Sequence, residues 1–472
     1  MHLPDWKTGL AAKHCRLAMA VTSAALVLAG CASLEPRYAD PSPVLPPVWP
    51  GQQANSAPHG ASSWDELVLD ERLRQVIGLA LENNDDLAIS ALRVERARQL
   101  YQIKQAGSLP DMSVEIAGSR ARTYGAAGSS LASTAVATVG FTSYELDLFG
   151  KVRSLKRAAL ETFLASQQTQ RQVRNIIVGD TIKRYLTLAA DQELLGLAQS
   201  TLDTRAESLK VLSARLRAGE ASPLDYRRAE AELAQAHDDL LAARSQVELD
   251  RQALDLTVGS PVHDAQLPVQ GHLADILSLE GVAVGLPSEV LLSRPDIQSS
   301  EHALVAANAN IGAARAAMFP SIGLTAAGGR ASADLGNLVT EGARYWSLAP
   351  TAALPIFDFG RRRAEAKAAE IDRDIAVRSY QLSVKEAFQQ VADALTVEEV
   401  ALERISAANW RQESSGEALR IVDRQFSAGI SAYIDVLDAH RTANEASRGL
   451  ILSMVSRDLN RVTLFVALGN GV

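Results

Sequence analysis

The stretch LFGKVRSLKRAALETF at residues 148–163 returns in altered form as DFGRRRAEAKAAEIDR at residues 358–373, a displacement of 210 residues. The same shift superimposes other punctuating residues: Leu87 on Ile297, Pro110 on Pro320, Gly219 on Gly429, Asp225 on Asp435 and Gly259 on Gly469. A shift that never slips over about 180 residues predicts one unit duplicated in tandem, with nearly equal element lengths in both copies. We therefore expect a quasi-symmetric architecture.

Two very long helices are predicted, one in each copy. Residues 151–218 and 361–428 contain no proline, and each as one helix would measure about 100 Å at 1.5 Å per residue. Helices of this length must pack as a coiled coil. In the following segment a heptad seam alternates large and small residues, namely Tyr226, Leu233, Leu240, Val247 and Leu254 with Ala229, Ala236 and Ala243. This pattern predicts a returning helix packed closely along its neighbours.

Four strands are predicted per chain. Apolar residues alternate with period two in Met112–Ile116 and Ala135–Phe141, and the pattern continues one register off at Tyr144, which predicts a bulge. The glycine- and serine-rich stretch Thr123–Ala132 is the expected turn. The second copy repeats the strands at Ser321–Thr325 and Arg344–Phe357, joined by a loop at Ser332–Gly342. Residues 70–108 before the first strand are expected to form one helix.

A four-stranded sheet leaves two open edges, which a membrane would penalise because their backbone groups have no partner there. Three chains would close twelve strands around a lumen, whereas eight strands would be filled by side chains. The expected fold class is mainly α with β. It combines a trimeric α-helical barrel of long antiparallel coiled-coil helices with a 12-stranded transmembrane β-barrel, four strands per chain, on an internal tandem repeat.

The N-terminus is typical of an exported lipoprotein. Three basic residues precede a twelve-residue apolar run, Leu17–Leu28, which is too short to span a bilayer, and Ala29-Gly30-Cys31 follows. The segment resembles a bacterial lipobox in which Cys31 is acylated. A plain secretory leader with a chance cysteine is the alternative. In this resemblance Ala32, rather than Asp, implies sorting to the outer membrane, where the chain would meet lipid.

Composition excludes several classes of function. The net charge is −8, and basic residues are spread along helical segments, which argues against a nucleic-acid partner. The two cysteines lie in the first 31 residues, and the histidines show no ligand spacing, so we expect no metal and no cofactor. Asp358-Phe359-Gly360 matches a kinase triplet, but the other kinase motifs are missing, so we interpret it as a strand-to-helix junction. We expect no enzyme and no catalytic residue.

These patterns divide the chain into six segments. They are a signal peptide at 1–30, a proline-rich tether at 31–69, a first repeat at 70–259, an equatorial connector at 260–287, a second repeat at 288–469 and a tail at 470–472.

Several motifs resemble one family at its own spacing. They are Arg294-Pro295-Asp296-Ile297, the run from Ala306 to Arg315, Phe319-Pro320, and Leu354-Pro355-Ile356-Phe357-Asp358-Phe359-Gly360. Residues 64–469 are similar to the TolC-type outer-membrane factors of tripartite efflux pumps, in the OprM and NodT lipoprotein branch. The resemblance implies a passive homotrimeric exit duct for drugs or other small molecules. It would dock to a periplasmic adaptor protein and an inner-membrane pump of the resistance-nodulation-division type.

The two helix-to-helix turns are the expected periplasmic tips, Ala218-Gly219-Glu220 and Ala428-Gly429-Ile430. Each glycine is expected in the left-handed conformation that ends a helix. In the family these tips dock the adaptor. Capping and docking stay open as explanations, because one residue can do both.

Three acids are candidates for a periplasmic gate: Asp225, Asp435 and Asp438. Ser222-Pro223-Leu224-Asp225 fits a capping box, which alone could explain Asp225. Ala432 takes the cap position in the second copy, so we expect Asp435 and Asp438 to have no capping role. Neither is expected to fill a core heptad position. In the family, acids at these positions ring the periplasmic entrance, although helix N-termini favour acids without any function.

One departure concerns the closed entrance. In TolC an arginine and a tyrosine bridge the acid at the Asp225 position, whereas Ser431 and Phe426 stand there in this chain. Another lock is therefore expected, with Arg227, Arg228 or Arg424 as candidates. Two rival functions stay open at this point, namely an outer-membrane exit duct for type I protein secretion and a soluble coiled-coil scaffold.

Overall fold

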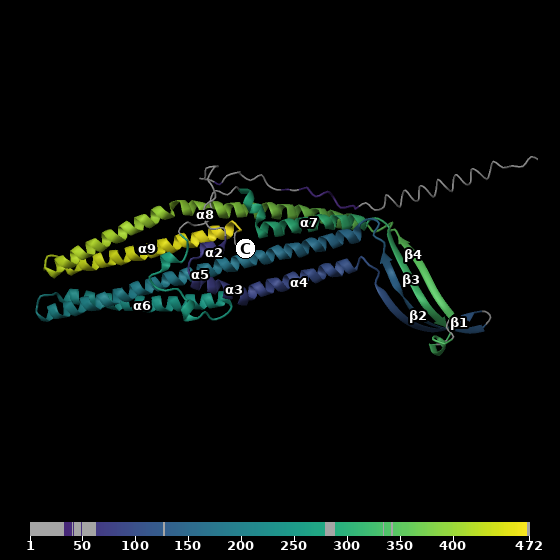
Figure 1. Cartoon of the computed structure of the whole chain (residues 1–472), viewed down its shortest axis with the longest axis horizontal. Coiled ribbons are helices and arrows are strands. Elements are labelled where there is room, and N and C mark those ends of the chain that lie inside the picture. The colour runs from purple at the N-terminus through teal and green to yellow at the C-terminus, as the bar shows by residue number, and fades with distance from the viewer. Residues whose placement is uncertain are drawn as a thin grey trace, which may run out of the picture. The chain divides into compact units, whose positions relative to one another are not determined.

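A computed structural model describes residues 33–39, 41, 49, 63–125, 128–278, 288–333, 335–340 and 343–469 (Figure 1). The chain divides into two compact units. The first contains Val94–Ser166 and Ser299–Gln381 with the described residues up to position 41, and the second contains the remainder. Each unit takes segments from both sequence copies. Cys31 and the tail at 470–472 lie outside the described residues.

The first unit contains a four-stranded antiparallel sheet, whose strands follow one another in chain order. The strands are β1 (Met112–Gly125), β2 (Gly128–Glu145), β3 (Ser321–Ser332) and β4 (Ala343–Ala353). This confirms four strands per chain. The register of β2 against β3 shifts between Phe141 and Tyr144, which confirms the predicted bulge. β1 and β4 are the two edges of the described sheet.

The strand ends differ from the prediction in two places. The turn expected at Thr123–Ala132 is wrong in extent, because Thr123 pairs with Ser130 within the ladder and their hydroxyl oxygens are 2.9 Å apart. Only residues 126–127 separate the strands. β4 ends at Ala353 rather than at Phe357, because Pro355 cannot donate a ladder hydrogen bond and restricts the residue before it.

The helices repeat at the predicted displacement. Each copy has a shorter helix before its strands and a long helix after them. The shorter helices are α4 (Asp85–Ala106) and α7 (Pro295–Ala316), and the long helices are α5 (Lys151–Arg217) and α8 (Arg361–Ser427). Both pairs are displaced by 210 residues at both ends, and α5 and α8 each run unbroken for 67 residues. The tandem repeat and the long helices are thus confirmed. Among the described helices, none combines the length and the apolar character that a bilayer crossing requires.

The expected single helix over residues 70–108 is interrupted at Asn84, which separates α3 (Glu71–Asn83) from α4. Its backbone is extended, with ψ of 124°, and its Oδ1 accepts a hydrogen bond from the Leu87 N–H at 3.0 Å. Its Nδ2 donates to the Thr257 carbonyl at 2.7 Å. The side chain therefore starts α4 and ties it to another helix. The run Asn83-Asn84-Asp85-Asp86 was the available signal, since these residues favour caps.

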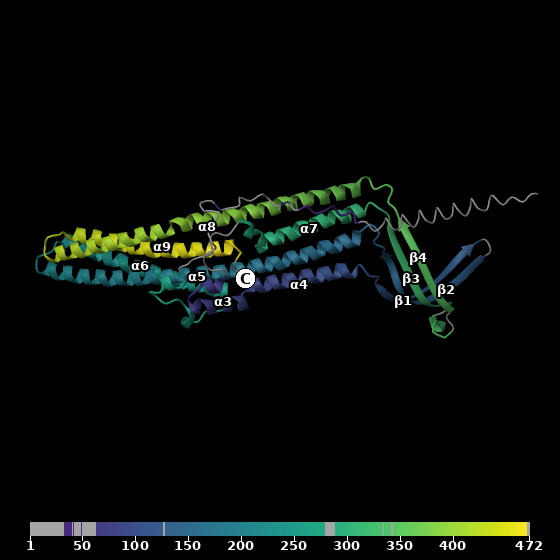
Figure 2. The ribbon, with the colours of Figure 1, turned by 45° about the horizontal axis from the view of Figure 1, so that its top comes forward.

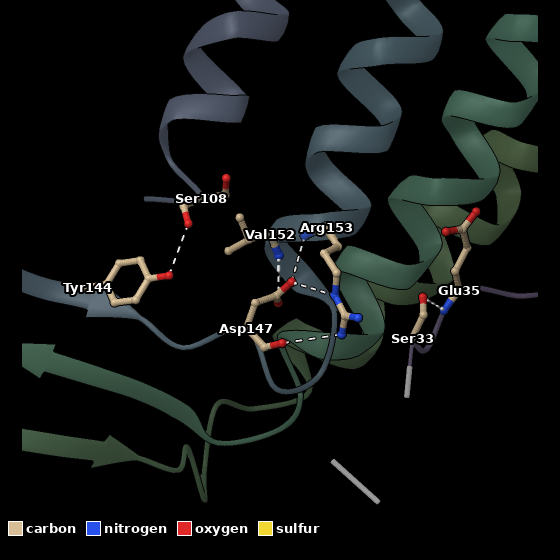
Figure 3. Close-up of polar contacts among 7 residues, drawn as sticks. All are labelled: Ser33, Glu35, Ser108, Tyr144, Asp147, Val152 and Arg153. Carbon is tan, nitrogen blue, oxygen red and sulfur yellow. Dashed lines mark hydrogen bonds and ion pairs between the residues drawn. The ribbon is translucent and has the colours of Figure 1, made fainter. Parts of the chain in front are cut away.

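An aspartate starts each long helix at its junction with the sheet, and Figure 3 shows the one before α5. The Asp147 carboxylate accepts from the backbone N–H groups of Val152 at 3.0 Å and Arg153 at 2.9 Å. The Asp358 carboxylate likewise accepts from Gly360 at 3.0 Å and Arg362 at 3.2 Å before α8. The interpretation of Asp358-Phe359-Gly360 as a strand-to-helix junction is confirmed.

The second unit contains two helical hairpins, in which α6 (Pro223–Val258) returns along α5 and α9 (Tyr433–Ala467) returns along α8 (Figures 1 and 2). Ala229, Ala236, Leu240 and Leu254 of the heptad seam are buried. Short elements complete the described chain: α2 (Trp64–Leu67), η1 (Asp264–Gln266), η2 (Leu273–Asp275), η3 (Ser288–Ser293) and η4 (Leu335–Asn337). Val68 bridges Leu277, which attaches the connector to the start of the helical region.

Candidate channel entrance

The two hairpin turns share one backbone conformation. Gly219 has φ of +77° and Gly429 has φ of +76°. The Glu220 N–H donates to the Arg215 carbonyl at 2.8 Å, and the Ile430 N–H donates to the Gln425 carbonyl at the same distance. This is the Schellman arrangement, so the predicted left-handed glycine at each helix end is confirmed. A Cβ at either glycine would meet no atom within 4 Å, so the backbone angle alone requires glycine here.

The turns present their residues to solvent in the single chain. All six tip residues are exposed, namely Ala218, Gly219, Glu220, Ala428, Gly429 and Ile430. Ile430 is an apolar residue and is 76% exposed. An accessible surface with an apolar residue is what a docking partner would use, and the tips have this property.

The first hairpin has the expected cap. The Ser222 hydroxyl accepts from the Leu224 N–H at 3.1 Å, and Pro223 opens α6. Asp225, in the first turn, forms an ion pair with Arg228 at 3.5 Å in its own helix. The Ser222 N-cap is confirmed, but the described contact of the Asp225 carboxylate is with Arg228 and not with the Ser222 N–H, so only half of the predicted capping box is formed.

The second hairpin corrects one expectation. The Asp435 carboxylate accepts from the Ala432 N–H at 3.1 Å, so Asp435 has a capping role although Ala432 offers no side-chain oxygen. Asp438 forms an ion pair with Arg441 at 2.7 Å, one turn along α9. Both acids are exposed and lie outside the core, as expected. Each of the three candidate acids is thus bonded within or directly before its own helix.

An apolar core packs the two hairpins together next to the tips. Its buried members are Leu212, Ala229, Tyr433, Val436 and Leu437, with Phe426 partly buried against them. Arg215 of α5 reaches the other hairpin, because its Nη1 donates to the Phe426 carbonyl at 3.4 Å and its Cζ lies 4.7 Å from that ring's centroid. Arg215 therefore joins the hairpins and was missed from the sequence.

The three arginines that were candidates to hold the entrance shut either form ion pairs within their own helix or are exposed. Arg227 pairs with Glu230 at 2.6 Å and Arg228 pairs with Asp225, both within α6. Arg424 is exposed on α8. None of these observations supports a lock through the three candidates in the single chain.

A buried polar cluster lies deeper along the same four helices. Arg205 of α5 is 5% exposed and its Nη2 lies 3.4 Å from a carboxylate oxygen of Glu232 on α6. His440 of α9 is also buried, and its Nε2 lies 3.7 Å from the Asp423 carboxylate of α8. A cavity of about 970 Å³ is lined in part by Asp423, Tyr433 and His440. This cluster also escaped the sequence analysis.

Burial dominates the electrostatics of this cluster. Desolvation and the nearby Arg205 cation lower the pKa of His440, which favours the neutral imidazole. Burial raises the pKa of the Tyr433 hydroxyl, against the effect of Arg205. A spacing signal existed, since Tyr433, Val436, His440 and Ala443 follow the three-four pattern of a helix seam, but a pattern cannot show which charges face it.

No group of three metal-ligating side chains comes together anywhere in the part of the chain that the structure describes.

The comparisons with known proteins identify the family. The family model for outer membrane efflux proteins matches twice, over residues 76–260 and 286–470. The chain belongs to the outer membrane efflux protein family. The two matched ranges are displaced by 210 residues, as the repeat requires.

Individual relatives agree over nearly the whole length. The chain is 37% identical over 458 residues to the solvent efflux pump outer membrane protein SrpC of Pseudomonas putida, covering 95% of this chain and 97% of that protein. It is 36% identical over 453 residues to the outer membrane protein OprJ of Pseudomonas aeruginosa, covering 95% and 94%. The open state of the Neisseria gonorrhoeae MtrE outer membrane channel matches with a TM-score of 0.84 and 34% identity, covering 93% and 98%.

Membership of this family confirms the general function that the sequence predicted. The protein is an outer-membrane exit duct of an efflux system, and its family and fold are those of channels. Like the outer membrane proteins and channels that it resembles, the protein lies in the outer membrane, and it extends into the periplasm. The soluble coiled-coil scaffold is thereby excluded.

Proposed function

We propose that three copies of this chain close one passive channel, and that the tips dock a periplasmic adaptor which connects it to an inner-membrane pump. The carrying observation is that α4 and α8 expose apolar residues at the positions that the repeat relates to the contact between α7 and α5. Within one chain the second half of copy one packs on the first half of copy two. Closure would use the same contact between the second half of copy two and the first half of copy one in the next chain.

The contact within the chain is well defined in the first unit, where α5 packs antiparallel on α7. The Ser299 hydroxyl donates to the Ala165 carbonyl at 3.0 Å, and His302 Nδ1 lies 2.8 Å from the Glu161 carboxylate. Ala158 packs in one buried cluster with Ala306 and Ala309. These pairs fix the register of the two helices.

A shift of 210 residues transfers this register to α8 and to α4 of the next chain. Ala165 becomes Ile375 and Ser299 becomes Ile89, while Glu161 becomes Ile371 and His302 becomes Leu92. All four are apolar, and they are exposed in the single chain by 58%, 44%, 49% and 70% in that order. Exposed apolar residues at matching positions mark an interaction surface. In the same register Arg378 would face Asp86, which adds a complementary charge pair.

Cysteine cross-linking tests this closure. Leu92→Cys with Ile371→Cys should give linked dimers and trimers in membranes treated with a short bifunctional thiol reagent, since the equivalent side chains of His302 and Glu161 meet within the chain. Leu92→Cys with Leu382→Cys is the matched control, because Leu382 is also exposed but lies about three turns away along α8. No cross-linking of the first pair, or equal cross-linking of the control, would contradict the proposed register.

The tips are the proposed entrance and docking surface. Ala218, Gly219 and Glu220 with Ala428, Gly429 and Ile430 would contact the adaptor, and their exposure supports this role. Asp435 and Asp438, with Asp225 beside them, would form the periplasmic gate of the closed channel. The protein would bind no nucleotide and catalyse no reaction, so energy would come from the pump, which we expect to be of the resistance-nodulation-division type.

We also propose acylation of Cys31. Ser33, two residues later, lies against Gly150 at the junction of β2 and α5, where a Cβ would come within 3.3 Å of the Ser33 Cα. Glu35 forms an ion pair with Arg157 at 3.1 Å (Figure 3 shows Glu35 beside the junction). Ser33 and Glu35 are thus held at the end of the sheet, which would bring a lipid on Cys31 close to the membrane. Mass spectrometry of the mature N-terminus should show an acylated cysteine, and an unmodified N-terminus elsewhere would contradict the proposal.

Small organic molecules are the proposed cargo, because SrpC is a solvent efflux protein and a passive duct takes what its pump delivers. Type I protein secretion remains the second candidate, since it would use the same architecture. Removal of the protein should increase sensitivity to solvents and drugs without changing the set of secreted proteins. The reverse result would favour secretion.

A further inference from the structure

Two buried polar atoms beside the entrance have no hydrogen-bond partner among the residues that the structure describes. They are Nη1 of Arg205 on α5 and the hydroxyl oxygen of Tyr433 on α9. Arg205 forms its ion pair with Glu232, which belongs to the same hairpin. A buried donor without a partner loses its hydration and gains nothing in exchange. These two unpaired groups therefore destabilise the packed arrangement of the two hairpins.

This destabilisation concerns the contact between the two hairpins. The charge of Arg205 acts on both Tyr433 and His440 of α9, and the charge of Glu232 acts on both as well. Asp423 brings a fourth helix to the same place. If the hairpins separated, water would reach Arg205 and Tyr433 and satisfy both. Separation would at the same time expose the apolar core of Leu212 and Val436. Hydration of the unpaired polar groups thus favours separation of the hairpins, whereas exposure of the apolar core disfavours it.

The repeat shows that the hairpin fold does not need this cluster. The position of Arg205 is occupied in the second hairpin by Ser415, whose hydroxyl donates to the Gln412 carbonyl at 3.1 Å. The position of Glu232 is occupied by Thr442. A long helical hairpin of the same length thus forms with small, locally satisfied side chains at both places. The hairpin fold therefore does not require the charged cluster, and we ascribe the cluster to the entrance.

We propose that Arg205 sets how readily the entrance opens, because its buried and partly satisfied charge weakens the packing of α9 against the α5–α6 hairpin that the apolar core favours. The inference rests on the proposed channel function and adds a residue that regulates the same entrance. Arg205 acts through the packing of the helices and contacts no transported molecule.

Single-channel recordings of the purified protein in planar bilayers test the proposal. Arg205→Met keeps the length of the side chain and removes its charge, and Glu232 is 43% exposed and can remain hydrated. We expect the open probability to fall about fivefold, since Met leaves neither a buried charge nor an unpaired donor at this contact. Leu212→Ala should raise the open probability, because it leaves a cavity in the apolar core. Tyr433→Phe should lower it by less than Arg205→Met.

Arg217→Met is the matched control, because Arg217 is exposed on the same helix, and it should leave the open probability unchanged. The decisive result is the opposite sign of Arg205→Met and Leu212→Ala. If Arg205→Met raises the open probability or leaves it unchanged, the inference is wrong and the channel function stands. If Arg205→Met does not assemble, the sign for Tyr433→Phe decides in the same way. A wild-type protein that forms no pore would overturn the proposed channel and this inference together.

Discussion

The α5–α6 and α8–α9 hairpins have the same backbone and different charges. Their long helices have equal lengths, and their turns have φ values of +77° and +76° at the tip glycines. The residues inside the helices diverge. Asp191 and Asp250 of the first hairpin correspond to Ala401 and Asn460 of the second. The repeat has kept what the backbone requires, whereas charged groups are particular to one copy. Differences between the copies therefore indicate where the entrance is regulated.

The largest effect is expected where the copies agree. Gly219→Ala and Gly429→Ala should each cost about 1 to 2 kcal/mol, because a Cβ disfavours the left-handed conformation of both turns. The two losses should be equal, since neither site is crowded. Thermal unfolding of the detergent-solubilised protein measures them. Ala218→Val and Ala428→Val are the neighbouring controls and should cost less. A loss at only one glycine would break the equivalence of the turns.

A smaller effect is expected at the caps, where the copies differ. Ser222→Ala should cost about 1 kcal/mol, because the Leu224 N–H loses its acceptor. Ala432→Ser in the second hairpin should stabilise by a similar or smaller amount, since Asp435 already satisfies one neighbouring N–H. Both are read from the same unfolding experiment. If Ala432→Ser destabilised the protein, the second cap would not be equivalent to the first.

The carboxyl pair of the first hairpin should give a small, pH-dependent effect. Burial and the neighbouring Asp250 raise the pKa of Asp191 from 3.8 to about 7. The folded state then binds the proton more tightly than the unfolded chain, so stability is greatest below pH 3.8 and falls as the pH rises through 7. Asp191→Asn should raise the unfolding temperature most at pH 8 and less at pH 5, because at pH 5 only part of the stability from proton binding has been lost.

The exposed Asp238 supplies the control, and Asp238→Asn should change neither value. An equal gain from Asp191→Asn at both pH values would show that proton binding is not the cause.

Much of this fold was predictable because its constraints are local or periodic. Proline and glycine positions marked the helix ends, and the heptad seam of Leu240 and Ala236 marked the buried face of α6. The break at Asn84 was missed because the contact that fixes it, to the Thr257 carbonyl, joins residues far apart in the sequence. The turn between β1 and β2 was drawn too long because glycine and serine also continue strands when the ladder supplies their hydrogen bonds.

The entrance was predictable only in part. Asp225, Asp435 and Asp438 were found because acids crowd the first turns of helices, but the hydrogen bond from Ala432 to Asp435 depends on the geometry of the turn. Arg205 and His440 were missed because neither stands out from other charged or seam residues on its helix. Their significance comes from four helices that bring them together, and no single-helix pattern contains that information.

The ion selectivity of the closed channel tests the gate most directly. Three chains would place three copies each of Asp435 and Asp438 around one axis, where fixed negative charge attracts cations. We predict that the wild-type pore prefers cations and that Asp435→Ala with Asp438→Ala weakens this preference and cation block in single-channel recordings, while trimers still form. Asp225→Ala should change selectivity less. Unaltered selectivity and block in the double variant would show that the two acids are only helix-terminal charges.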